Sequence, residues 1–105
     1  MKAIHPGKIL RRELKARNLS ANALALALRT PSGRITDVLN GKRGVSPETA
    51  MRLARYFGNS ARFWLNVQTA YELAIAEAEL GERIAAEVAP AARGTPLPTG
   101  EQSMS

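Results

Sequence analysis

The sequence predicts an all-α domain of five helices, the last one extended and followed by a disordered tail. Alanine is abundant, and aromatic residues make up only 5% of the 105 residues, a composition that favours helix over strand. Apolar residues recur at helical spacing in five separate stretches. Ser or Pro stands at the start of each stretch, and Asn, Gly or Pro follows its end.

The first two helices are expected over residues 6–17 and 21–28. Pro6 suits a first helical turn because that turn leaves its backbone donors unpaired in any case. The hydroxyl of Ser20 is expected to cap the second helix. Leu26 lies off the apolar face of that helix and is either exposed to solvent or part of a contact.

A tight break separates the second helix from the third. Pro31 pushes the residue before it out of the helical region, so Arg29, Thr30 and Pro31 end the second helix. Ser32 is a candidate cap for a short third helix over residues 33–39. Asn40 and Gly41 tolerate the left-handed conformation and stop that helix.

The fourth and fifth helices have clearer start signals. Ser46 followed by Pro47 predicts a helix that runs to about Phe57 and ends at Gly58. Ser60 is expected to cap a longer helix over residues 61–80.

The chain is expected to lose order after this fifth helix. Gly81 is expected to interrupt it, with a weaker helix over residues 82–88. From residue 89 the chain is rich in Pro, Gly, Thr and Ser, which bury too little apolar area to offset the entropy of ordering. Residues 81–105 are therefore expected to form a weak helix and a disordered tail.

Composition excludes several functional classes. The chain has no cysteine and one histidine, His5, so it offers no thiolate chemistry and no pair of imidazoles. His5 is expected to cap a helix or lie at the surface. No catalytic site, metal site or cofactor is expected. The absence of a long apolar run predicts a cytoplasmic protein with no membrane partner.

The net charge of +6 and the pI of about 10.5 suggest a polyanionic partner. The charge is divided unevenly along the chain. Residues 1–62 carry 13 Lys and Arg against three acidic residues, and residues 63–105 carry two against six. This division indicates either two surfaces with different partners or a basic body with an acidic helix for solubility.

Two short helices joined by a tight break are typical of a helix-turn-helix domain that binds DNA. The major groove is about 12 Å wide and admits one helix, which must be short, exposed on one side and braced by a partner. Segment 32–39 meets these conditions, and a basic loop follows it. The residues expected to contact DNA are Ser20, Thr30, Ser32, Gly33, Arg34, Thr36, Asp37, Asn40, Lys42 and Arg43.

Their expected roles differ. Arg34 can read a guanine through two hydrogen bonds, bind a phosphate or remain solvated. Lys42 and Arg43 are expected to clamp phosphates, because most protein–DNA contacts go to the backbone. Asp37 can accept from cytosine, cap the helix or pair with Lys42 or Arg43, and Asn40 can bond a phosphate or cap the helix.

The remaining contacts are less specific. Thr36 can touch a thymine methyl group or a phosphate, and Ser32 a phosphate.

The fifth helix carries apolar residues that need a partner. Trp64 can pack against the first and fourth helices or take part in an interface. Tyr71, Leu73 and Ile75 lie beyond the expected core on a helix with acidic outer positions. These four residues are the expected homodimer interface, and dimerisation with a second protein bound nearby is the alternative use.

The sequence resembles a known family in several segments. The stretches Leu19–Ala25 and Arg34–Arg43 are similar to the Cro/C1-type (lambda repressor-like, or Xre) helix-turn-helix. More narrowly, the chain resembles the HigA (VapI-like) antitoxins. That resemblance is carried by His5-Pro6-Gly7, Asn40-Gly41-Lys42-Arg43-Gly44, Ala50-Met51-Arg52-Leu53-Ala54-Arg55-Tyr56-Phe57-Gly58 and Phe63-Trp64-Leu65-Asn66-Val67-Gln68. It covers residues 4–80, with the helix-turn-helix core over about 8–62 and the dimerisation helix after it.

The resemblance implies a homodimeric DNA-binding antitoxin that neutralises a RelE-like (HigB-type) ribonuclease toxin and represses its own operon on double-stranded operator DNA. The chain departs from the family at Arg29, where glycine is usual, at Gly33, where a side chain is usual, and at Leu26, which is usually polar. These departures leave open a toxin-binding module with weak DNA binding. A stand-alone transcriptional regulator is another alternative. A basic RNA-binding protein is a further one, although the aromatic residues cluster at positions 56–71 and offer no stacking platform for bases.

Overall fold

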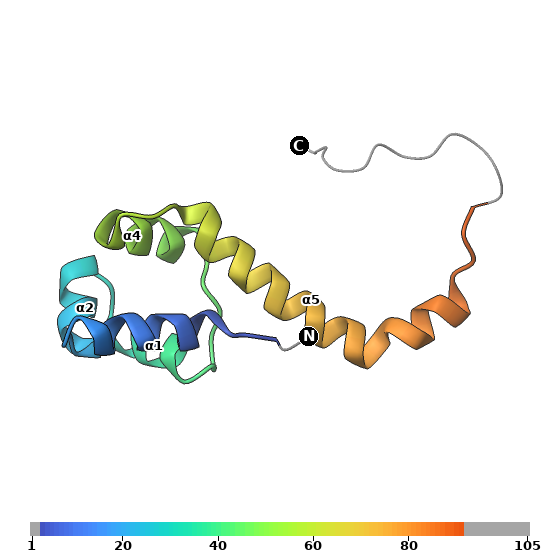
Figure 1. The fold of residues 1–105 in the computed structure, drawn as a ribbon, viewed down its shortest axis with the longest axis horizontal. Helices are drawn as coiled ribbons and strands as arrows, with labels where there is room; N and C mark the ends of the chain where they lie inside the picture. Colours follow the sequence, from blue (N-terminus) through green and yellow to red (C-terminus); the bar gives the residue numbers. More distant parts are fainter. Residues whose placement is uncertain (1–2, 92–105) are drawn as a thin grey trace.

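The computed structural model describes residues 3–91, and these residues form an all-α fold with no strand (Figure 1). Its helices are α1 (Pro6–Ala16), α2 (Ala21–Leu28), α3 (Ser32–Leu39), α4 (Pro47–Phe57) and α5 (Ala61–Glu87). The predicted fold class and the order of the five helices are confirmed. Residues 88–91 are not helical, and the part of the predicted disordered tail beyond residue 91 lies outside the described residues.

One hydrophobic core joins α1 to α4 and the first turns of α5. Leu10, Leu24, Ile35 and Leu53 are fully buried, so each of α1 to α4 contributes at least one of its deepest residues. Trp64 of α5 is 1% exposed and closes this core. Burial of one such side chain stabilises the fold by about 1.5–3 kcal/mol. The core therefore fixes how α2 and α3 lie against each other.

Three serine caps predicted from the sequence are confirmed. The hydroxyl oxygens of Ser20, Ser46 and Ser60 accept hydrogen bonds from the backbone N–H groups three residues later, at 3.0, 3.2 and 3.0 Å. The expected cap at Ser32 is wrong. Ser32 is the first residue of α3, and Pro31 occupies the cap position without a side-chain hydrogen bond.

His5 caps α1. Its Nδ1 accepts from the backbone N–H of Gly7 at 2.9 Å, and its ring meets Tyr71 of α5 edge-on at 4.8 Å between centroids. Gly7 lies directly against the backbone carbonyl of Val38 in α3, where a side chain would overlap. The start of α1 is therefore packed between α3 and α5.

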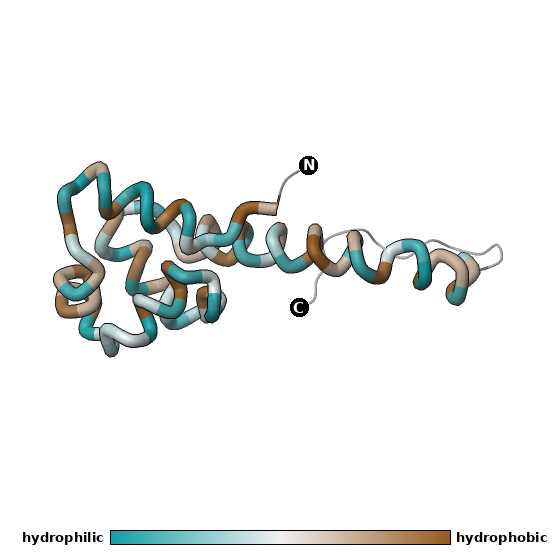
Figure 2. Tube along the Cα trace, turned by 90° about the horizontal axis from the view of Figure 1, so that it is seen from below, coloured by the Kyte–Doolittle hydropathy of each residue, from teal (hydrophilic) through white to brown (hydrophobic). Residues whose placement is uncertain are grey.

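Helix α5 is continuous over 27 residues, so the expected interruption at Gly81 is wrong. At 1.5 Å per residue the helix is about 40 Å long, and its far half extends beyond the other helices (Figure 1). Hydrophobic and hydrophilic residues alternate along it (Figure 2). Among the described residues, no helix is both long and apolar enough to span a membrane.

Candidate nucleic-acid interface

The turn between α2 and α3 is built around Arg29. Arg29 adopts φ 56° and ψ 46°, the left-handed conformation that glycine adopts without steric cost. This backbone lets the N–H of Thr30 return to the carbonyl of Ala25 at 3.0 Å. Arg29 thus holds the left-handed position of the turn at a conformational cost of about 1–2 kcal/mol.

Arg52 of α4 stabilises the same turn by a hydrogen bond to the end of α2. Its Nη1 donates to the carbonyl of Leu28 at 2.9 Å, while its Nη2 pairs with Glu48 at 3.0 Å. Thr30 donates its hydroxyl to the same Leu28 carbonyl at 3.4 Å. The sequence did not single out Arg52, because this contact joins residues 24 positions apart.

Helix α3 has one buried and one open face. Ile35 is fully buried and Val38 is 1% exposed, so these two residues anchor the helix in the core. The outward positions predicted to face DNA divide by exposure: Ser32, Gly33 and Thr36 are exposed, and Arg34 and Asp37 are half-buried.

Gly33 leaves open space on the outer face, since no atom lies within 4 Å of where its side chain would begin. Arg34 makes no ion pair within residues 3–91. Its guanidinium therefore remains available to a ligand.

The basic loop after α3 folds back onto that helix. The backbone N–H groups of Lys42 and Arg43 donate to the carbonyl of Asp37 at 2.8 and 3.2 Å. The carboxylate of Asp37 also lies 3.9 Å from the guanidinium of Arg43. Of the alternatives for Asp37, the structure shows pairing with Arg43, and Lys42 is exposed beside them.

Asn40 occupies the C-cap position of α3 and binds a residue that sequence reasoning missed. Arg11 of α1 donates through Nη2 to the Asn40 side chain at 3.1 Å and to the carbonyl of Leu39 at 3.0 Å. Arg11 thus ties α1 to the end of α3. This contact joins residues 29 positions apart, so helical spacing within α1 does not reveal it.

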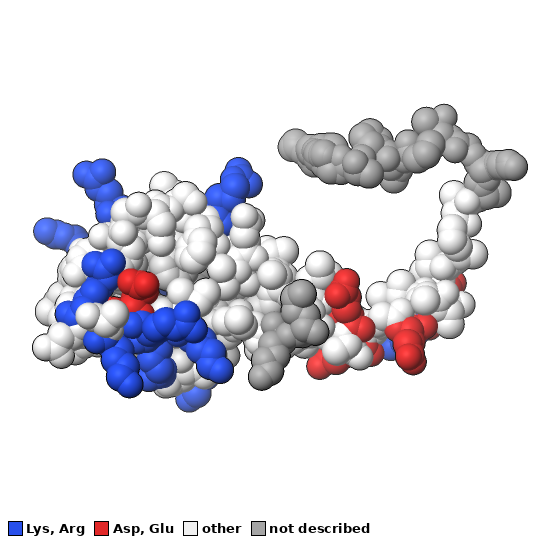
Figure 3. All heavy atoms as spheres, viewed as in Figure 1, with Lys and Arg blue, Asp and Glu red and all other residues white. Residues whose placement is uncertain are grey.

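No contact joins Ser20 to the candidate residues of α3 and its loop among the hydrogen bonds and ion pairs of residues 3–91. Ser20 is exposed at the start of α2, and its hydroxyl caps that helix. Asp37, Asn40 and Arg43 are linked through α3 and its loop. Lys and Arg project from the five-helix body, whereas acidic residues gather along the far half of α5 (Figure 3).

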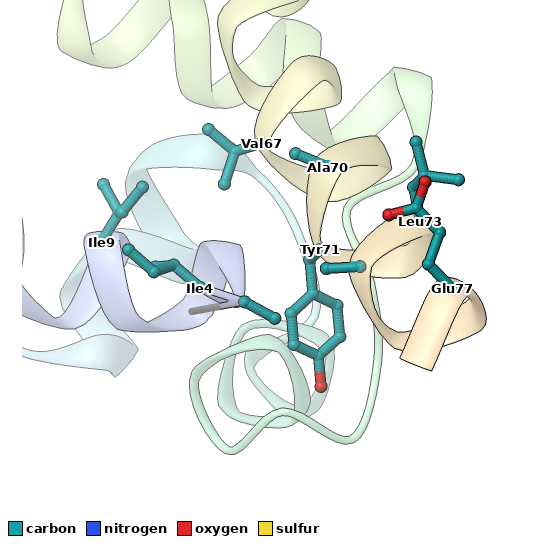
Figure 4. Close-up of a pocket in the computed structure, with 9 residues that line it drawn as sticks. Ile4, Ile9, Val67, Ala70, Tyr71, Leu73 and Glu77 are labelled. Carbon is teal, nitrogen blue, oxygen red and sulfur yellow. The ribbon is translucent and has the colours of Figure 1, made fainter. Parts of the chain in front are cut away.

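A second surface lies between the start of α1 and α5. An apolar groove of about 560 Å³ is lined by Ile4 and Ile9 on one side and by Val67, Ala70 and Tyr71 on the other (Figure 4). Leu73, 54% exposed, also lines it.

The other two residues assigned to a dimer interface lie elsewhere. Trp64 is in the core, where its indole N–H donates to Asn59 at 2.9 Å, so burial withholds it from a partner subunit. Ile75 is half-buried and does not line the groove.

Comparison with known proteins identifies the helix-turn-helix part of the chain. The family model described as "Helix-turn-helix" matches residues 10–64, which contain α2, the turn and α3. Virulence-associated protein I of Dichelobacter nodosus is 55% identical over 78 residues, 73% of this chain and 72% of that protein. A HigA-family addiction module antidote protein from Coxiella burnetii is 46% identical with a TM-score of 0.84, covering 87% of this chain and all of that one.

The chain belongs to the HigA family of helix-turn-helix proteins. Another solved structure is that of the Pseudomonas aeruginosa antitoxin HigA with the higBA promoter. That protein is 44% identical with a TM-score of 0.82, covering 85% of this chain and 98% of that one. Within this HigA-family chain, Leu26 is 73% exposed next to the turn, so the departure at that position creates no packing contact.

Proposed function

We propose that this chain is a DNA-binding antitoxin that represses its own operon and neutralises a RelE-like ribonuclease toxin. The observation that carries the DNA-binding part is the short helix α3. Its buried residues hold it against α2 while its outer face and the basic loop stay open. The likeness to HigA solved with the higBA promoter supports a promoter as the target. Such a target lies in the bacterial cytoplasm.

Within this function, Arg34 reads a base and Lys42 holds a phosphate. Arg34 lies on α3 with no ion pair among the described residues, and Lys42 is exposed on the following loop. Arg43 shares the phosphate role, and its pairing with Asp37 presents it from the loop. Ser20, Thr30, Ser32, Gly33, Thr36 and Asn40 complete the proposed surface.

We expect the two cationic roles to separate in a binding experiment on the promoter DNA of the chain's own gene. Arg34→Ala should reduce the preference for the operator over random duplex, because a two-bond contact to guanine discriminates by about 1–3 kcal/mol. Lys42→Ala should weaken both duplexes by the same factor. Fluorescence anisotropy with both DNAs measures the difference.

Arg83→Ala is the control, because Arg83 pairs with Glu87 on the far half of α5, and it should leave both affinities unchanged. A dimer that neutralises about eight phosphates should give a log–log salt slope near −7. A salt-independent affinity, or operator preference retained in Arg34→Ala, would contradict this placement of α3.

The groove between α1 and α5 is the proposed homodimer face, with Tyr71 and Leu73 as its contacts. Two half-sites one helical turn apart, about 34 Å, are how this motif gains affinity. An exposed apolar groove of this size also favours a protein partner over solvent.

Toxin neutralisation is proposed from the family and from the acidic far half of α5. Co-expression with the small basic protein encoded beside this gene tests it: the pair should restore growth and purify as one complex. Toxicity that this chain does not relieve, or the absence of a toxic neighbour, would leave the alternative of a stand-alone transcriptional regulator.

A further inference from the structure

Gln68 of α5 is a buried polar side chain that the proposed DNA contacts do not include. It is 8% exposed, and both ends of its amide are bound. Its Oε1 accepts from the backbone N–H of Val45 at 2.8 Å, and its Nε2 donates to the carboxylate of Glu72 at 2.8 Å. A buried amide is costly without such partners, so this side chain is held in one orientation.

The loop between α3 and α4 is shaped to receive this amide. A side chain on Gly44 would place its first atom 2.7–2.8 Å from the amide atoms of Gln68, closer than real contacts allow. Gly44 does not have a positive φ, unlike Gly41 and Gly58. Glycine therefore stands at position 44 for space: it lets the loop backbone lie against the Gln68 amide.

Lys42 and Arg43 lie in a loop segment that is held by hydrogen bonds on both sides. On the α3 side, Arg11 holds Asn40, and the Asp37 carbonyl accepts from the backbone of Lys42 and Arg43. On the α4 side, Gln68 holds Val45, which is 5% exposed. Lys42 and Arg43 stand between these points, so the hydrogen bond from Val45 limits where their side chains can reach.

We propose that Gln68 is a positioning residue for DNA binding, which acts through Val45 and Gly44 to fix the phosphate-contacting loop. The proposal rests on the proposed DNA-binding function and assigns part of it to α5, a helix outside the helix-turn-helix pair. Gln68 does not touch DNA. It affects the placement of Lys42 and Arg43. The position of Arg34 does not depend on it, because the buried residues of α3 hold that helix in the core.

A double-mutant cycle on the full chain tests this role, with operator affinity as the readout. Gln68→Met keeps the side-chain length but removes both hydrogen bonds, and we expect about a tenfold weaker operator complex. In that background Lys42→Ala should cost far less than it does in the parent, because the loop no longer places the cation. Arg34→Ala should keep its full effect. Such non-additivity identifies residues that act together, and a general loss of stability would not produce it for one partner alone.

A second variant restores the geometry without the original residues. The Gln68→Glu/Glu72→Gln exchange keeps an acceptor for the Val45 N–H, an amide donor facing it, and the same net charge. It should bind the operator within about twofold of the parent, and thermal melting should place all variants as folded at the assay temperature. If Gln68→Met melts below that temperature, Gly44→Ala replaces it in the cycle, since it displaces the same amide.

The outcomes separate the two proposals. A parent chain that does not bind its promoter overturns the proposed function. A parent that binds while Gln68→Met binds equally well, or while Lys42→Ala costs the same in both backgrounds, overturns the role of Gln68. A Lys42→Ala change that is silent in the parent overturns it too, because the loop then carries no phosphate contact to position.

Discussion

Arg29 has an unfavourable backbone conformation in the turn before α3. Its φ of 56° is left-handed, where a side chain costs about 1–2 kcal/mol that glycine does not incur. We expect Arg29→Gly to raise the free energy of unfolding by about 1 kcal/mol, less whatever glycine adds to the entropy of the unfolded chain. Urea denaturation measures this change.

Asn18 provides the matched control, since its φ of 55° is equally left-handed. Asparagine tolerates that conformation better than arginine does, so Asn18→Gly should stabilise the protein clearly less. An Arg29→Gly variant that is no more stable than the parent would contradict the idea that this turn is strained.

His5 makes stability depend on pH. Desolvation by burial lowers the pKa of His5 below its ordinary value of 6.5, and its Nδ1 must stay unprotonated to accept from Gly7. The unfolded chain takes up this proton at a higher pH than the folded chain does. Stability is therefore complete above about pH 6.5 and falls as the pH drops through the lowered pKa.

His5→Asn keeps a capping acceptor that does not titrate. We expect the melting temperature of the parent to fall relative to that of the variant between pH 7 and pH 5. Melting temperatures that change in parallel over this range would mean that the cap does not depend on the protonation of His5.

Residue roles were predictable where they depend on neighbours in sequence. The caps at Ser20, Ser46 and Ser60 bind backbone three positions away, so composition and spacing reveal them. Arg11 and Gln68 act across 29 and 23 residues. Spacing within one helix carries no signal for such contacts, and both residues were missed as anchors of the basic loop.

Helix α5 continues through Gly81, a residue of low helix propensity. Gly81 lies within it with no atom near enough to need its missing side chain, so its cost is one of propensity alone, about 1 kcal/mol. We expect Gly81→Ala to slow amide hydrogen exchange across the last turns of α5 by up to about fivefold, with little change in global stability because these turns lie outside the core.

Gly58 at the end of α4 is the opposing control. Its φ is 79°, so Gly58→Ala should destabilise the whole protein by about 1 kcal/mol instead of strengthening a helix. Faster exchange in Gly81→Ala would contradict a purely local cost at position 81.

The face of α5 was harder to predict than its existence. Tyr71, Leu73 and Ile75 were grouped by their apolar character. Spacing alone pairs Tyr71 with Ile75, four residues on, and sets Leu73 apart, which is not the pair that lines the groove. The structure places Tyr71 and Leu73 at the groove, and Ile75 is not part of its lining. Which apolar positions remain uncovered depends on how α1 lies against α5, and that is a tertiary property.

At the scale of the whole molecule, the fold separates the two charge regions that the sequence places in its two parts. On the face that Figure 3 shows, Lys and Arg lie mainly on the body that holds α3, and most acidic residues lie on the far half of α5. No residue of α3 lines the groove, so we expect a second subunit seated there to leave α3 of each copy open to DNA. Dimerisation should therefore raise the affinity for operator DNA, and the partner subunit and the DNA should not compete for one surface.

Two charge-matched variants on α5 test that link. Leu73 lines the groove and is 54% exposed, whereas Leu80 is 39% exposed and does not line it. Leu73→Glu should give a monomer at micromolar concentration in sedimentation velocity, because it adds a charge to an apolar contact that would be buried. Its operator affinity should fall at least about tenfold, since each half-site is then bound without its tethered neighbour.

Leu80→Glu adds the same charge on the same helix and should remain dimeric with parental affinity. A Leu73→Glu variant that still sediments as a dimer would move the interface away from the groove, and a monomer that keeps full operator affinity would show that this chain binds its half-sites independently.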